Sequence, residues 1–103
     1  MTQHDLLRKI KLLKPVYEKE GFVIDGIFGS YARGEQTPRS DVDILYHLKQ
    51  PFFEQFQGFI GFKKLNEIKQ DISKALNVDV DLAPRNNLSR SGKKHIMRDI
   101  LYV

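Results

Sequence analysis

The sequence contains no cysteine, so it has no disulfide framework and no thiolate chemistry. It also has no apolar run near the ~20 residues that a membrane-spanning helix needs. The first residues, MTQHDLLRKIKLL, lack the apolar core and small-residue cleavage site of a signal peptide. Internal repeats and low-complexity segments are absent as well. These absences exclude fibrous, disulfide-rich and membrane-spanning classes, and we expect a cytoplasmic address.

The composition is that of an ordinary small globular protein. The chain has 103 residues, which predicts a single domain over 1–103 rather than two. Apolar residues make up 41% and charged residues 29%. The net charge is +4, and all of the surplus lies after residue 83. A basic end of this kind can attract phosphates or an acidic partner. A solvated helix face is the simpler interpretation, and the support for nucleic-acid binding is weak.

Hydrophobic spacing and turn residues predict an α/β fold. Period-two and β-branched segments indicate strands, and apolar positions three or four apart indicate helices. Pro15 is expected to open a second turn or to kink the first helix, and Pro51 to mark a connector. The order predicts a small mixed sheet with helices against it. The expected helices are 5–14, a short one within 29–35, 59–76 and 93–102, and the expected strands are 22–28, 41–47 and 78–82.

Three aspartates carry the strongest chemical signal: Asp41, Asp43 and Asp81. Asp41 and Asp43 lie two positions apart on a predicted strand, so both carboxylates should share one face. Carboxylates this close repel each other unless a cation lies between them. Mg²⁺ takes oxygen ligands and is commonly shared between carboxylates and substrate phosphates. With a third carboxylate from a neighbouring strand, the pair could hold two ions for in-line phosphoryl displacement.

The segment before this pair strengthens the signal. Gly29 and Ser30 lie where a predicted strand should turn into a helix. Glycine lets backbone amides approach a phosphate, and a helix N-terminus favours an anion. Ser30 can cap that helix or donate its hydroxyl to the phosphate. A phosphate cradle shortly before a metal-binding pair predicts a site for a nucleoside triphosphate with its metal.

The string GSYARGEQTPRSDVDIL resembles the G-S-x10-D-x-D signature of the polymerase-β-like nucleotidyltransferases. The lead-in GIFGSYARGE, the later VDL and the ending IMRDILYV are similar to their minimal branch. That branch comprises the MNT domains found as antitoxins beside HEPN-domain toxins. The resemblance covers essentially the whole chain. It implies the α/β palm of this superfamily, with a small mixed β-sheet flanked by helices.

The resemblance also implies roles for individual residues. Gly29 and Ser30 would hold the triphosphate of ATP, and Asp41 and Asp43 would hold Mg²⁺. Asp81, in the VDL segment, would be the third carboxylate, as a metal ligand or as the base for the acceptor. Asp79 lies one pleat earlier on the same face and is its rival. Arg33 matches the family arginine, and it would either touch phosphate or brace the loop through a carboxylate.

The implied reaction is transfer of AMP from ATP to a tyrosine of a HEPN-domain toxin. Larger nucleotidyltransferases carry a helical domain for the base or acceptor, and we expect no room for one after Asp81. Two alternatives remain: the same chemistry on a small molecule or an RNA end, or a module that neutralises a toxin by contact alone. The sequence leaves open whether the chain associates with itself.

Several other features are explained more simply by packing or solvation than by function. Five phenylalanines crowd residues 52–62, and we expect most of them in the core, with part of the stripe as a possible partner surface. The three histidines show no ligand spacing and are expected to be structural or solvated. Tyr102 is expected to be a packing residue rather than an acceptor.

Overall fold

A four-stranded mixed sheet in the order β3-β2-β1-β4 forms the centre of the molecule. The computed structural model describes residues 1–87, 94 and 98–103. Strands β1 and β2 are antiparallel, as are β1 and β4, whereas β2 and β3 are parallel. The elements are α1 (Gln3–Glu18), β1 (Phe22–Phe28), α2 (Gly29–Arg33), β2 (Val42–Leu48), α3 (Gln50–Gln55), α4 (Phe59–Leu76), β3 (Val80–Pro84), η1 (Arg85–Asn87) and β4 (Leu101–Tyr102).

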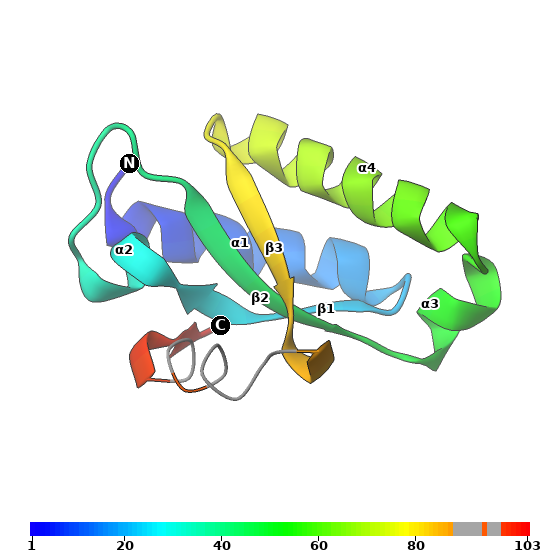
Figure 1. The fold of residues 1–103 in the computed structure, drawn as a ribbon. Coiled ribbons are helices and arrows are strands. Elements are labelled where there is room, and N and C mark those ends of the chain that lie inside the picture. Colours follow the sequence, from blue (N-terminus) through cyan, green and yellow to red (C-terminus); the bar gives the residue numbers. More distant parts are fainter. Residues whose placement is uncertain (88–93, 95–97) are drawn as a thin grey trace.

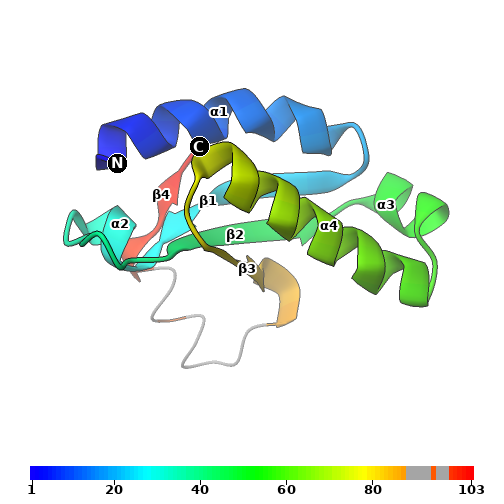
Figure 2. The ribbon, with the colours of Figure 1, turned by 90° about the horizontal axis from the view of Figure 1, so that it is seen from above.

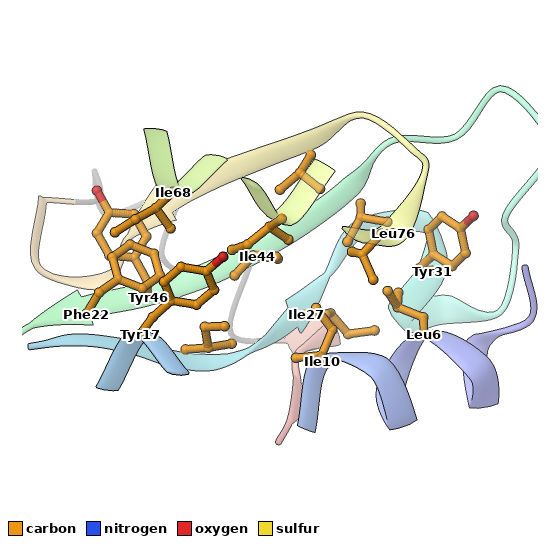
Figure 3. Close-up of a cluster of buried hydrophobic side chains, with 14 of the residues drawn as sticks. Leu6, Ile10, Tyr17, Phe22, Ile27, Tyr31, Ile44, Tyr46, Ile68 and Leu76 are labelled. Carbon is orange, nitrogen blue, oxygen red and sulfur yellow. The ribbon is translucent and has the colours of Figure 1, made fainter. Parts of the chain in front are cut away.

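Helices α1 and α4 cover one face of the sheet, as Figure 2 shows from above. The hydroxyl of Thr2 caps α1 by accepting a hydrogen bond from the Asp5 backbone N–H, 3.0 Å away. Helix α4 ends at Asn77, which adopts the left-handed conformation with φ 55°. The inner faces of both helices meet the sheet in a hydrophobic core, drawn in Figure 3, which includes Leu6, Ile10, Ile27, Ile44, Ile68, Ile72 and Leu76.

The opposite face of the sheet, called here the second face, receives the alternate side chains of each strand. In β2 the core takes Val42, Ile44 and Tyr46, whereas Asp43 and the residues two and four positions later face the other way. This alternation follows from the period of two in a strand. It places the acidic residues of the sheet on the face that α1 and α4 do not cover.

The structure corrects the expected boundaries at both prolines. Helix α1 continues through Pro15 to Glu18, because the buried Tyr17 holds its last turn against the core. The connector expected around Pro51 is helix α3, in which the proline lies in the first turn, where its missing N–H costs little. Strand β2 begins one residue later than expected, so Asp41 lies just before it.

The expected C-terminal helix over 93–102 is wrong at its end. Residues 101–102 form β4, whose backbone pairs with β1 through Gly26↔Tyr102 and Ile27↔Leu101. The free edge of β1 offers unpaired donors and acceptors, and this pairing satisfies them. Positions 93 and 95–97 of that expected helix lie outside the described residues. Tyr102 is 62% exposed, so the expectation that it packs is also wrong.

The aromatic stripe is less buried than expected. Phe52 lies in the core and Phe56 packs against it. Phe53, Phe59 and Phe62 are 55%, 91% and 74% exposed. This exposed group lies at α3 and the start of α4, at the opposite end of the molecule from α2 (Figure 1). Over the part of the chain that the structure describes, no helix combines the length and apolarity required to cross a membrane.

Candidate active site

The turn from β1 into α2 brings Gly29 against the second face of the sheet. Gly29 has φ +75°, a conformation that residues with a side chain rarely adopt. A Cβ built at this position would collide with Oδ2 of Asp43. Glycine is therefore required here twice, once for the backbone and once for the carboxylate beside it. Ser30 follows as the second residue of α2, and its carbonyl accepts a hydrogen bond from the Glu35 N–H at 2.9 Å.

Strand pairing brings Asp43 and Asp81 side by side. In the parallel ladder between β2 and β3, Asp43 is the register partner of Asp81. On its other side, Asp43 is opposite Phe28, the residue directly before Gly29. The pairing therefore gathers the glycine turn and two of the predicted carboxylates at one end of the sheet. Gly29, Ser30, Asp43 and Asp81 come from three elements that the sequence separates widely.

The electrostatics of this place concentrate on Asp43. Burial raises the pKa of the Asp43 carboxyl, and the negative charges of Asp81 and Asp41 raise it further. Arg33 acts in the opposite direction as the weakest of the named influences. Both acidic neighbours thus lie near enough for their charges to be felt at Asp43. A cation placed among these carboxylates would relieve the repulsion.

Asp41 and Asp79 lie at the same end of the sheet as Asp43 and Asp81. Both are exposed and precede their strands, and the Asp79 carbonyl accepts a hydrogen bond from the Val42 N–H at 2.9 Å. Both line a hollow of about 660 Å³ between the loop before β2 and the end of α4. Asp79 is thus not the register partner of Asp43. The ladder favours Asp81 over Asp79 as the third carboxylate.

Arg33 is engaged with carboxylates rather than left free. Its Nε lies 3.1 Å from Oε2 of Glu35, and its Nη1 lies 3.5 Å from Oδ2 of Asp99. These partners raise the pKa of Arg33, with the hydrogen bond to Glu35 as the largest cause. The side chain is exposed, so the energy of these pairs is small. Of the two expected roles, this arrangement matches the brace between α2 and the segment before β4.

Two charged contacts escaped the sequence analysis. Lys69 reaches from α4 to within 3.8 Å of Oδ1 of Asp81. Asp25 is part-buried at a bulge of β1, and both of its oxygens lie 2.9 Å from Nδ1 of His47. Arg85 adds a contact to Oδ1 of Asp25 at 3.2 Å. His47 is thus structural, as expected. The bulge had no sequence signal, since it depends on the pairing between β1 and β2.

The carboxylates have the donor atoms that a divalent cation prefers, but the described side chains do not form a complete coordination site. Among residues 1–87, 94 and 98–103, no three side chains of Asp, Glu, His or Cys lie close enough to hold a metal ion as they stand. Asp41, Asp43 and Asp81 offer an all-oxygen donor set, which is the set that Mg²⁺ prefers. The charges of Asp81 and Asp41, which add to the effect of burial in raising the pKa of Asp43, would be offset by a positive charge among them.

A family model described as a nucleotidyltransferase domain matches residues 9–103. This chain is a member of that family. The match includes the glycine turn and every predicted site carboxylate. The nucleotidyltransferase domain here belongs to the minimal branch of the polymerase-β-like superfamily, as the motif implied.

Relatives of the domain carry consistent names. "Putative protein adenylyltransferase MJ0126" of Methanocaldococcus jannaschii is 38% identical over 100 residues, covering 96% of this chain and 92% of that protein. "Protein adenylyltransferase MntA" of Thermococcus cleftensis is 34% identical over 90 residues, covering 87% of this chain and 83% of that protein. The nucleotidyltransferase domain therefore spans almost the full length of proteins that are named as transferases.

Solved structures share the fold. One described as a "putative minimal nucleotidyltransferase" superposes with a TM-score of 0.75 at 22% identity, covering 100% of this chain and 97% of that one. A toxin–antitoxin complex with AMP-PNP contains a chain that matches with a TM-score of 0.66 at 24% identity, covering 92% of this chain and 69% of that one. The expected fold class, a small mixed sheet flanked by helices in the palm of this superfamily, is confirmed.

Proposed function

We propose that this nucleotidyltransferase domain transfers AMP from ATP to a partner protein and acts as the antitoxin of a HEPN-domain toxin. The observation that carries the proposal is the 38% identity to a relative named as a protein adenylyltransferase, over 96% of this chain. The glycine turn against Asp43 and the pairing of Asp43 with Asp81 support it. The reaction belongs in the cytoplasm, where ATP and Mg²⁺ are available.

The proposed roles follow the placement of each residue. Asp41, Asp43 and Asp81 would hold Mg²⁺, which supplies charge neutralisation at the phosphates when bound. Gly29 and Ser30 present backbone amides and a hydroxyl at the turn, and we assign them to the triphosphate. Catalysis by this chain is then positioning and electrostatic stabilisation rather than covalent chemistry.

Arg33 enters the proposal as a residue that holds the turn. Its contacts with Glu35 and Asp99 tie α2 to the segment before β4. A turn held in this way keeps Gly29 against Asp43. Because α1 and α4 cover one face of the sheet, the nucleotide and the acceptor would have to share the second face. We therefore propose that the partner protein completes the acceptor site.

The deciding experiment is transfer of label from α-³²P-ATP in the presence of Mg²⁺. The acceptors offered are the protein encoded beside this chain and a host-cell extract. Wild type is compared with the Asp41→Asn/Asp43→Asn double variant, which removes two proposed metal ligands while the fold is retained. We expect a labelled partner band with wild type and none with the double variant.

Three outcomes would contradict the proposal. A double variant that labels the partner as well as wild type would remove the carboxylates from the mechanism. A partner that binds and is neutralised equally by both proteins, with no label in either, would indicate a module that acts by contact. Label on a small molecule or an RNA end, with none on protein, would assign the same chemistry to another acceptor.

A further inference from the structure

The four tyrosines of the chain divide into three buried residues and one exposed residue. Tyr17, Tyr31 and Tyr46 are 8%, 4% and 6% exposed, and all three belong to the core cluster drawn in Figure 3. Burial raises the pKa of Tyr17 and Tyr46 above the ordinary value. The side chains of these three tyrosines are largely shielded from a nucleotide in solution. Tyr102, at 62% exposed, is the tyrosine whose hydroxyl a reagent can reach.

Strand pairing places Tyr102 on the same face as the candidate active site. Leu101 packs against the core, so its neighbour Tyr102 projects to the second face. The register partner of Tyr102 is Gly26, which is itself opposite Leu45 of β2. In the next row on that face, two residues along, the partners are Phe28 and Asp43. Asp43 and Tyr102 are therefore separated by one intervening strand and one pleat.

This separation is short on the scale of a tyrosine and a nucleotide. Strand spacing of ~4.8 Å and a rise of ~3.3 Å per residue put the two Cα atoms roughly 12 Å apart. Gly26 has no side chain to stand between β2 and β4 in the row of Tyr102. Strand β4 is at the outer edge of the sheet, so no further strand flanks Tyr102 among the described residues. A phenol at this position can approach a phosphate held beside Asp43.

We infer that Tyr102 is an acceptor in its own right, so that the chain adenylylates itself at this residue. The inference rests on the proposed function, since it uses the same site and the same nucleotide. The phenolic Oη of Tyr102 attacks the α-phosphorus of ATP and forms an O–P bond. The bond from that phosphorus to the bridging oxygen breaks, and pyrophosphate leaves with the electron pair. The phenolic proton passes to a site carboxylate or to water.

Tyrosine is favoured over the exposed hydroxyls of the loop before β2. Thr37 and Ser40 are bound to each other there, since the Thr37 N–H donates to the Ser40 hydroxyl at 2.8 Å. A phenol also loses its proton more readily than an aliphatic alcohol, so it is the better nucleophile near neutral pH. Tyr102 is thus exposed, lies on the same face as the candidate active site and carries the more acidic hydroxyl.

The test incubates the full chain, tagged at its N-terminus, with α-³²P-ATP and Mg²⁺. It is run alone and with the neighbouring protein as acceptor, and the mass of the chain and of its peptides is recorded. The variants are Tyr102→Phe, Tyr46→Phe as a matched buried control, and Asp41→Asn/Asp43→Asn. We expect one adenylyl group on the peptide that contains Tyr102. Label on Tyr102→Phe should fall to the level of the double aspartate variant, whereas Tyr46→Phe should retain it.

The remaining outcomes separate the inference from the proposed function. Tyr102→Phe that still labels the partner shows an intact enzyme, so loss of its own label supports the inference. Undiminished label on Tyr102→Phe overturns it. Wild type that labels the partner but never itself overturns the inference and leaves the proposed function standing. Wild type that labels neither overturns both.

Discussion

Gly29 contributes to the candidate site because its lack of a side chain leaves space for the Asp43 carboxylate. Its Cα lies against the carboxylate of Asp43, and its φ of +75° suits glycine. The two demands can be separated, because Gly34 has nearly the same φ, +72°, with nothing within 4 Å of an added Cβ. The chain therefore supplies its own control for the cost of backbone conformation.

We predict that Gly29→Ala abolishes AMP transfer, because the new methyl group displaces the Asp43 carboxylate. Gly34→Ala should lower the free energy of unfolding by ~1 kcal/mol, which is also the backbone cost expected for Gly29→Ala, and it should keep most of the transfer activity. Urea unfolding and label transfer on both variants check this. Equal loss of activity in the two variants would show that the backbone, rather than the carboxylate, sets the requirement for glycine.

The raised pKa of Asp43 makes folding stability depend on pH. The folded chain holds this proton more tightly than the unfolded chain, whose carboxyl has the ordinary value of 3.8. Between that value and the raised pKa, the folded state binds more protons, so stability falls as pH rises. We predict that Asp43→Asn removes this fall: the difference in stability between the variant and wild type should grow in the variant's favour across the window.

Urea midpoints measured at a series of pH values, without divalent cations, test this prediction. Charged groups far from Asp43 contribute equally in both proteins, so the difference in stability reports on Asp43 together with the acidic neighbours whose charges act on it. Adding Mg²⁺ at neutral pH should then stabilise wild type and narrow the gap. A difference that stays constant with pH would contradict the assigned cause.

At the scale of elements, Asp25 fastens three strands together. It lies at the bulge of β1, and its partners are His47 on β2 and Arg85 directly after β3. Its side chain is 9% exposed, so these charge-assisted bonds are largely shielded from water. The cluster therefore holds together the strands on which the site depends.

We predict that Asp25→Asn lowers the free energy of unfolding by about 2 kcal/mol, since one acceptor oxygen and the charge are lost. Arg8→Gln is the control, because Arg8 pairs with Asp5 at 3.5 Å on the surface. It should change stability by less than ~0.5 kcal/mol. Denaturant unfolding of both variants decides this, and equal effects would make the Asp25 cluster ordinary surface charge.

The sequence predicted the elements whose reasons are local. Helix α4 has apolar residues at helical spacing and a left-handed stop, and β1 is a run of β-branched and aromatic residues. The glycine turn and the Asp41–Asp43 pair were found for the same reason, since each is a short motif. Asp81 was predicted as the third carboxylate from the later VDL segment, and the ladder between β2 and β3 pairs it with Asp43.

The elements that were missed depend on distant parts of the chain. Pro15 stays helical because Tyr17 is packed against a strand that comes later in the sequence. Residues 101–102 have the spacing of a helix and become β4 because β1 has a free edge. The bulge at Asp25 and the reach of Lys69 to Asp81 likewise exist only once strands and helices have met.

At the scale of the whole molecule, large apolar side chains are unevenly placed. Phe52 is 2% exposed and stands in the core, whereas Phe59, seven positions later, is 91% exposed. We predict that Phe52→Ala lowers the free energy of unfolding by about 3–5 kcal/mol. Phe59→Ala should change it by less than ~0.5 kcal/mol. Urea denaturation measures both, and a large loss for Phe59→Ala would mean that this residue is packed against something.

The parallel pairing of β2 with β3 also determines when, during synthesis, the candidate active site can form. Asp43 and Asp81 are separated along the chain by the whole of α3 and α4, and they meet only after β3 has docked. Closing that loop costs entropy, and it forces like charges together in the same step. On the ribosome, β1, α2 and β2 are complete well before β3 emerges. The nascent chain therefore lacks this acidic pair until β3 has been synthesised and has docked on β2.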